Sequence, residues 1–335
     1  MKRGSAFAAR LSVSMLVCAA VAACGSPADP AAAVVAPATS APAPAPPNPA
    51  SVAANELGLV PVLMYHQIVA VPGGEYDQTP AEFTAELDRL YREGYRPVTL
   101  ARYLAGDLNL PAGTHPVVLT FDDSTRSQLS FTDTGAVTPD CAVGLLEDFA
   151  ARHPDFPATA SFYVNNDPFG NDARALPWLA AHGYEIGAHT ANHANLATLD
   201  ATGVQREFAE NIRAITAAVP GYTVHTMALP LGIAPADRAL ARAGSWDGTS
   251  YAFDGVLLVG SNPAPTPFGD LDPGGIPRIR SGRGDVPFDS GYWLDDLAAH
   301  PGGRYTADGD PARVSFPSGL AGELAPRWST QAQPY

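Results

Sequence analysis

Along this chain, short and continuous apolar runs alternate with longer stretches in which hydrophobic and polar positions are mixed. The runs are rich in β-branched and aromatic residues, which is typical of strands buried on both faces of a sheet. We predict strands over 61–66, 96–100, 117–121, 158–164, 184–188, 225–229, 256–259 and 276–279.

The stretches between these runs carry hydrophobic residues at helical spacing. The first has complete start and stop signals, because Thr79 can cap it, Pro80 suits its first position, Glu82 completes a capping box and Gly94 ends it. Further helices are predicted near 103–104, from 138 through 149, over 204–219, over 237–243 and near 293–299. From about residue 301 the pattern assigns no element.

Strands that alternate with helices predict an α/β fold built on a parallel sheet. The number of units favours an irregular parallel (β/α) barrel, a distorted relative of the TIM barrel. An open doubly wound sheet is the alternative. No glycine-rich phosphate loop follows the first strand, so nucleotide binding is not indicated.

The N-terminus has the pattern of a secretory signal. Lys2, Arg3 and Arg10 precede an apolar run over 11–23 that is too short to span a bilayer. The run ends in Val-Ala-Ala before Cys24, which resembles the lipobox of bacterial lipoproteins. That resemblance implies cleavage after residue 23 and lipidation of Cys24; an ordinary signal peptide cut at the same place is the alternative.

Composition divides the chain further. Residues 25–54 are dominated by Ala and Pro and cannot bury a core, so they should form an extended tether. We predict a lipoprotein signal peptide at 1–23, the tether at 24–56, a catalytic domain at 57–320 and a C-terminal tail at 321–335. The expected location is extracytoplasmic, with the lipid on Cys24 anchoring the protein to the cell membrane.

Charge and cysteine content exclude two classes of protein. The net charge is −14 and no basic stripe exists, which argues against nucleic-acid partners. Cys141 is left without a partner once the signal peptide and Cys24 are accounted for, so no disulfide framework is available.

Two adjacent carboxylates, Asp122 and Asp123, end the apolar strand over 117–121. Both can be ionised there only beside a cation or a hydrogen-bonding shell. Consecutive residues near a strand end point in different directions, so one could bind a metal while the other handles a proton. A simple turn or helix cap is the alternative.

His189 and His193 are four residues apart and follow the strand over 184–188. On a helical turn, this spacing brings both imidazoles to one side. Together with one carboxylate they would leave positions open on a catalytic zinc or a related divalent ion. Two exposed turn histidines are the alternative, but the carboxyl ends of parallel barrel strands converge on one face, which favours a shared site.

These residues carry a resemblance to the polysaccharide deacetylase family, also called the NodB-homology domain or carbohydrate esterase family 4. The family motif T-F-D-D matches 120–123, H-[ST]-x-x-H matches 189–193, and P-Y-G resembles 230–232 with leucine in place of tyrosine. The resemblance extends over about 61–279, and its opening P-V-L-M-Y-H is similar to the poly-N-acetylglucosamine deacetylase subgroup.

The resemblance implies a role for each matched residue. Asp123, His189 and His193 would bind the metal, which is zinc in the first instance, with cobalt or nickel as alternatives. Asp122 would be the general base, and the backbone N–H of Leu231 would stabilise the oxyanion. Pro230, in the third motif, is a candidate for contact with the substrate, and His66, which ends the first strand outside these motifs, is another.

Two features depart from the family pattern. An arginine often precedes the third motif and orients the base, whereas this chain has Met-Ala-Leu at 227–229. The histidine expected late in the domain as general acid has no match, since the surroundings of His300 do not fit. His66 could line the same face, although a structural histidine is an equal alternative.

We therefore expect a metal-dependent hydrolase that removes N-acetyl groups from an N-acetylglucosamine-containing glycan, either a polysaccharide or peptidoglycan, at the cell surface. An O-acetyl esterase acting on a polysaccharide such as xylan needs the same site and is the first alternative. A catalytically decayed glycan-binding lipoprotein is the second. No protein partner is implied.

Overall fold

The computed structural model describes residues 47–260, 262–281 and 287–335. The predicted signal peptide, Cys24 and most of the tether lie outside the described residues and stay predictions. Within the described ranges, no helix is both long enough and apolar enough to cross a membrane.

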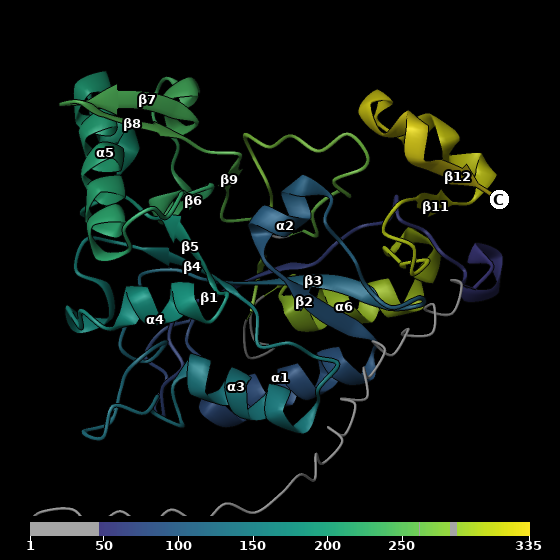
Figure 1. Cartoon of the computed structure of the whole chain (residues 1–335), viewed down its shortest axis with the longest axis horizontal. Coiled ribbons are helices and arrows are strands. Elements are labelled where there is room, and N and C mark those ends of the chain that lie inside the picture. The colour runs from purple at the N-terminus through teal and green to yellow at the C-terminus, as the bar shows by residue number, and fades with distance from the viewer. Residues whose placement is uncertain (1–46, 261, 282–286) are drawn as a thin grey trace, which may run out of the picture. The chain divides into compact units, whose positions relative to one another are not determined.

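The centre of the fold is a parallel sheet (Figure 1). Its strands are β1 (Val62–Tyr65), β2 (Tyr95–Val98), β3 (His115–Phe121), β4 (Ser161–Val164), β5 (Glu185–Ala188), β6 (Thr226–Ala228), β9 (Gly255–Leu257) and β10 (Ile279–Arg280). The order is β10-β1-β3-β4-β5-β6-β9, with β2 paired to the first half of β3. A parallel bridge between Leu257 and Ile276 joins β9 to the segment that leads into β10. The sheet thus curls round on itself, which confirms the predicted distorted (β/α) barrel.

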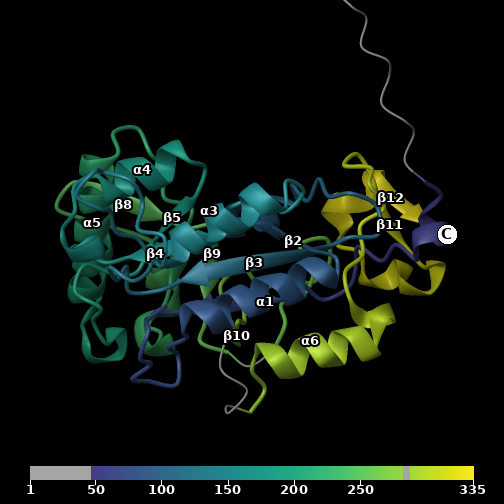
Figure 2. The ribbon, with the colours of Figure 1, turned by 90° about the horizontal axis from the view of Figure 1, so that it is seen from below.

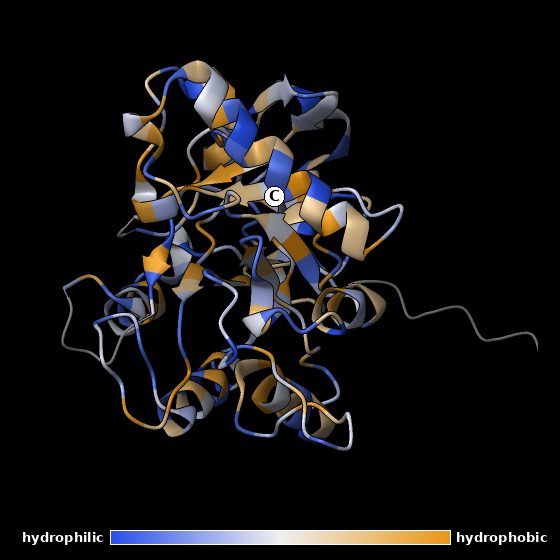
Figure 3. Cartoon of the chain, turned by 90° about the vertical axis from the view of Figure 1, so that its left-hand side faces the viewer, coloured by the Kyte–Doolittle hydropathy of each residue, from blue (hydrophilic) through white to orange (hydrophobic). Residues whose placement is uncertain are grey.

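Six helices accompany the sheet in the described part of the chain. They are α1 (Pro80–Arg92), α2 (Leu100–Ala105), α3 (Ala142–Arg152), α4 (Ala175–Ala181), α5 (Ala201–Ala218) and α6 (Ser290–Ala299). Most carry both hydrophobic and hydrophilic residues (Figure 3), because one face of each packs on the core. The predicted capping box of α1 is confirmed, with Thr79 and Glu82 bonding each other's backbone N–H groups.

Several elements differ from the prediction. The helix expected over 237–243 is a 3-10 turn over Arg238–Ala241, followed by a hairpin of β7 (Ala243–Trp246) and β8 (Thr249–Ala252). The hairpin turns at Asp247 and Gly248, which both have left-handed φ angles (46° and 75°), as a two-residue Asp-Gly turn requires. Helix α4 has no side-chain N-cap, which removes the local signal that would predict it.

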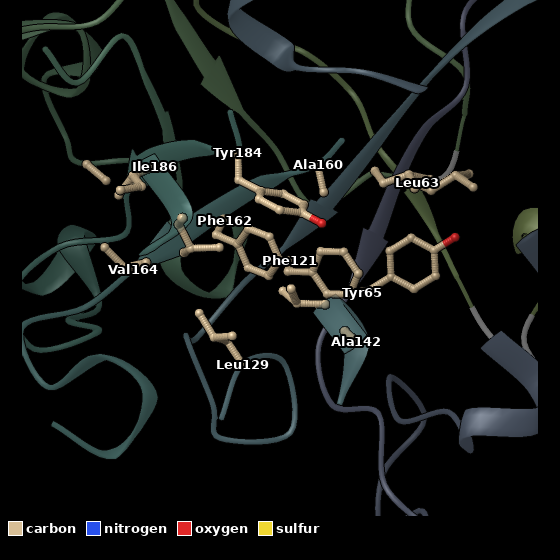
Figure 4. Packing of buried hydrophobic residues seen from close by; sticks show 14 of the residues in the cluster. Leu63, Tyr65, Phe121, Leu129, Ala142, Ala160, Phe162, Val164, Tyr184 and Ile186 are labelled. Carbon is tan, nitrogen blue, oxygen red and sulfur yellow. The ribbon is translucent and has the colours of Figure 1, made fainter. Parts of the chain in front are cut away.

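An aromatic row fixes the register of three neighbouring strands (Figure 4). The rings of Tyr65 in β1, Phe121 in β3 and Phe162 in β4 lie opposite one another and stack, with centroids 5.0 and 4.9 Å apart. Side chains alternate along a strand, so the residues after Tyr65 and Phe121, namely His66 and Asp122, point to the opposite side. This packing therefore brings His66 and Asp122 to the barrel opening together.

The end of the chain packs against the residues that precede β1. Strands β11 (Val314–Phe316) and β12 (Ala332–Pro334) pair in parallel, and the Tyr335 hydroxyl donates to the Ala54 carbonyl. Asn55 forms a bridge with Thr306. Residues 54–56, which we assigned to the tether, and the tail over 321–335 therefore belong to the packed body.

The same junction buries two carboxyl groups next to each other. Glu56 is 4% exposed and Asp308 is 2% exposed. Glu56 accepts hydrogen bonds from the Tyr305 hydroxyl (3.1 Å) and the Ser315 N–H (2.7 Å). Burial, and then the charge of Asp308, raise the pKa of Glu56 to about 8.

This raised pKa makes folding stability depend on pH. The folded protein holds the Glu56 proton more tightly than the unfolded chain, whose carboxyl has its ordinary pKa of 4.5. The contribution of Glu56 to the free energy of unfolding should be greatest below about pH 4.5 and fall by about 1.4 kcal/mol per pH unit as the pH rises toward 8. Glu56→Gln should remove this contribution, as urea titrations at pH 5 and pH 8 would show. The exposed Glu323→Gln is the control, and parallel pH profiles for wild type and Glu56→Gln would contradict the assignment.

Candidate metal centre

The three predicted ligands converge at the carboxyl ends of β3 and β5. The Oδ1 atom of Asp123 lies 3.4 Å from Nε2 of His189 and 3.3 Å from Nε2 of His193. All three ligand atoms lie within 4.8 Å of one another. The structure thus brings together the residues that two separate motifs supplied.

Their arrangement fits a tetrahedral divalent ion. Bonds of about 2.0–2.1 Å to a tetrahedral zinc place neighbouring ligand atoms about 3.4 Å apart, which matches the two distances from Asp123. Oδ1 of Asp123 is buried and accepts no hydrogen bond within the described residues, as expected of an atom that binds an ion. Three protein ligands leave one position open, which is the pattern of a catalytic site.

The tautomer of His189 also suits metal binding. Its Nδ1 lies 2.8 Å from the carbonyl oxygen of Ala228 in β6. A carbonyl can only accept, so Nδ1 carries the hydrogen and Nε2 keeps a lone pair that points toward Asp123. His189 is buried and His193 is partly exposed, so the open side of the site is the side of His193.

Backbone strain gathers around these ligands. Ten non-glycine residues in the described part of the chain have positive φ. Five of them belong to the loops of this site, with φ between 47° and 73°: Asp123, Ser124, Thr190, His193 and Leu231. Each such conformation costs about 1–3 kcal/mol and persists only where the surrounding contacts impose it.

Asparagine side chains hold the loop that carries the histidines. The Asn165 amide after β4 donates to the carbonyls of His189 (2.6 Å) and Thr190 (2.9 Å). The Oδ1 atom of Asn211 in α5 accepts from the His189 N–H (3.2 Å). The backbone on both sides of His189 is therefore fixed by side chains from two other elements.

Helix α5 contributes a second clamp through Glu207, which is buried. Its carboxylate accepts from both the backbone N–H and the side-chain amide of Asn192, each at 2.9 Å, and its carbonyl accepts from the Ala191 N–H. Glu207 and Asn211 are one helical turn apart and so share a face. The sequence analysis missed both; the signal available was a pair of polar residues on the apolar face of an amphipathic helix.

We predict that Glu207→Gln weakens zinc binding about tenfold, because glutamine can accept from the Asn192 N–H but presents an NH₂ group to the Asn192 amide. Competition with a chromophoric chelator measures the dissociation constant. Glu210→Gln, on the same helix, is the matched control and should bind zinc as wild type does. Equal affinities for all three proteins would show that the clamp does not act on the ligands.

The other carboxylate, Asp122, is buried in an ion pair. Its two oxygens accept from Nη1 and Nη2 of Arg278, each at 2.7 Å, and both side chains are almost fully enclosed. Nη1 also donates to the Thr120 hydroxyl (3.2 Å), and Nε donates to the Leu258 carbonyl (2.8 Å). Burial alone would raise the pKa of Asp122, but the Arg278 guanidinium outweighs it and holds that pKa well below its usual range.

Arg278 corrects the expectation that no arginine orients the base. The residues before the third motif are indeed Met227, Ala228 and Leu229, but the guanidinium arrives from the segment that leads into β10. A sequence signal existed, because an arginine inside an otherwise apolar strand needs a carboxylate partner.

A cavity of about 300 Å³ opens beside the ligands. Asp122, Asp123, His189 and His193 are among the residues that line it. Apolar side chains form much of the rest, from Met64, Leu229, Leu231 and Val259. The cavity is thus lined by both metal-ligating and apolar side chains.

His66 and Tyr76 complete the lining. Their rings are 4.8 Å apart, and Nδ1 of His66 is buried without a hydrogen-bond partner in the described part of the chain. Burial lowers the pKa of His66, so its ring favours the neutral form. His300 is exposed at the end of α6, bonds to Asp296 and does not line the cavity.

The third motif forms a tight turn at the cavity edge. Leu231 is 58% exposed and lines the cavity, and its N–H makes no hydrogen bond within the described residues. That N–H is therefore free to serve as the predicted oxyanion donor. Pro230 is buried in the turn and is not among the residues that line the cavity, and its contact with a substrate stays a prediction.

Comparison with known proteins agrees with this geometry. Residues 110–246 match the family model described as polysaccharide deacetylase. Among solved structures, the chain resembles the polysaccharide deacetylase BC0361 of Bacillus cereus (18% identity, 72% of this chain and 68% of that one, TM-score 0.53). It also resembles the Streptococcus pyogenes deacetylase PplD (18% identity, 68% and 95%, TM-score 0.52). At 18% identity, the structural likeness shows that the fold is shared.

The fold and the converging site define a hydrolase of the deacetylase class. Residues 110–246, less than half of the chain, match the model of the polysaccharide deacetylase family, and this match supports a deacetylase hydrolase. The matched segment includes Asp122 and all three predicted ligands. His66 and Arg278 lie outside it. The sequence had indicated that His66 could line this face, whereas the place of Arg278 in the site comes from the structure alone.

Proposed function

We propose that this protein is a metal-dependent deacetylase that removes N-acetyl groups from an N-acetylglucosamine-containing glycan outside the cytoplasm. The observation that carries the proposal is the convergence of Asp123, His189 and His193 beside a half-apolar cavity. Zinc suits this set of one carboxylate and two imidazoles, with cobalt or nickel as alternatives.

The residues that line the cavity can contact both the methyl group and the carbonyl oxygen of an acetamide. The apolar wall of Met64, Leu229 and Val259 suits the acetyl methyl group, and the Leu231 N–H can bind the carbonyl oxygen as it gains charge. When bound by its three ligands, a divalent ion supplies Lewis acidity and lowers the pKa of a water molecule. Asp122, held ionised by Arg278, can accept a hydrogen bond or proton from the attacking water.

We assign to His66 the transfer of a proton to the leaving nitrogen. It has a buried ring nitrogen without a partner, it lines the cavity, and it lies on the side of Asp122. The strongly lowered pKa of Asp122 makes that carboxylate a weak base, so a neutral imidazole nearby is better matched to carry the proton onward. This assignment fills the role for which the sequence offered no family match.

The alternative of a decayed, glycan-binding protein was based on two missing groups, an arginine that orients the base and a general acid. Arg278 supplies the first and so weakens this alternative. The S. pyogenes deacetylase PplD was solved in complex with acetate, which is the product that deacetylation releases. We expect acetate as the product of this chain too.

Acetate release from an N-acetylglucosamine oligomer, measured with zinc content, tests the proposal. Asp122→Asn and His66→Gln should keep the metal and lose about 10²-fold or more in rate, because each removes a proton-transfer group. His189→Ala should lose both metal and rate. His300→Gln, a histidine outside the cavity, should match wild type. Equal rates in all five proteins, or acetate released only from acetylated xylan, would reject the proposed activity.

The location is part of the proposal, supported by the basic residues, the apolar run and Cys24 in the sequence. A lipid on Cys24 would hold the catalytic body at the membrane surface through the Ala/Pro tether. Cys24→Ser, expressed with its full N-terminus in a bacterium that lipidates such proteins, should move from the membrane fraction to the soluble fraction. Retention of the variant in the membrane fraction would contradict the anchor.

A further inference from the structure

A second cavity, of about 240 Å³, lies where the loop after β4 meets α4 and α5. These helices contact each other, and both contact β5, whose carboxyl end carries His189 (Figure 2). None of the sequence motifs maps to this cavity. It therefore calls for an explanation of its own.

A hydrogen bond links one of its lining residues to a lining residue of the catalytic cavity. Asn165 lines the second cavity, and His189 lines the catalytic one. The Asn165 amide donates to the His189 carbonyl at 2.6 Å. To enter the second cavity, a polymer with one unit beside the metal ligands would have to extend over the loop that carries His189.

The second cavity favours an uncharged ligand. Asp172 is the sole ionisable residue among the described residues that line it, and Arg174 pairs with it through two hydrogen bonds, at 2.8 and 2.5 Å. That pairing, ahead of the other contributions, lowers the pKa of Asp172 to about 2. A charged ligand would thus find no free counter-charge here.

The remaining walls combine free amides with small apolar side chains. Oδ1 of Asn165, Nδ2 of Asn166 and the Asn171 side chain have no hydrogen-bond partner among the described residues. Apolar walls come from Leu176 and from the α5 residues Ala214, Ile215 and Ala218, the two alanines leaving the space open. Amides can both donate to and accept from hydroxyl and acetamido groups, and an apolar patch suits an acetyl methyl group.

We propose that this cavity is a second subsite for the same polymer, where it binds a neutral N-acetylated hexose unit other than the one undergoing deacetylation. The inference rests on the proposed function for the identity of the polymer. Occupation of this subsite would contribute binding energy for long chains and none for short ones.

Ala218→Leu tests the subsite, because leucine fills the cavity and keeps a strong helix former in α5. Ala217→Leu is the matched control, since the neighbouring residue is exposed and does not line the cavity. For a hexamer of N-acetylglucosamine, Ala218→Leu should raise KM about tenfold, a loss of about 1.4 kcal/mol, with kcat within about twofold of wild type. For the dimer, Ala218→Leu, Ala217→Leu and wild type should have the same KM.

A rise in KM that is equal for dimer and hexamer, or no rise at all, overturns the subsite. Calorimetric binding of the hexamer separates this failure from failure of the proposed function. If the wild-type protein binds the hexamer without deacetylating it, and Ala218→Leu weakens that binding, the subsite is retained and the proposed activity is rejected. Wild-type protein that neither binds nor deacetylates the hexamer overturns both.

Discussion

The buried ion pair between Asp122 and Arg278 is the interaction on which the rest of this structure depends. Strand β1 lies between β3 and β10 in the sheet, so the pair connects two segments that are not neighbours. Removing one partner of such a pair leaves an uncompensated buried charge, at a cost of about 3–5 kcal/mol. The pair therefore links the end of β3 to the segment that leads into β10, at the edge of the site.

The pair also explains how two adjacent carboxylates take opposite roles. Both oxygens of Asp122 accept hydrogen bonds from Arg278, and the side chain is almost fully buried at the wall of the catalytic cavity. Asp123 turns away in a left-handed conformation (φ 73°) and leaves Oδ1 free of hydrogen bonds beside two imidazoles. One carboxylate is kept charged by an internal cation, and the other has a vacant oxygen that an external cation can occupy.

Local signals in the sequence predicted much of this arrangement. The apolar strands, the capped first helix and the two motifs that carry the metal ligands all depend on residues within a few positions of one another. The prediction failed where a partner is distant or a cap is missing. Arg278 meets Asp122 across more than a hundred residues of chain, and α4 lacks a capping side chain. The tail packs on residues far from it in the sequence, Ala54 and Pro267.

The sequence by itself determined which residues could bind a metal and that a parallel barrel would bring them to one face, because spacing and hydrophobic period are local properties. Only the tertiary structure decided which arginine neutralises Asp122, which side chains of α5 hold the histidine loop, and that His66 enters the cavity. These depend on contacts between distant segments, and such contacts form only when the strands adopt one register and the sheet curls into a barrel.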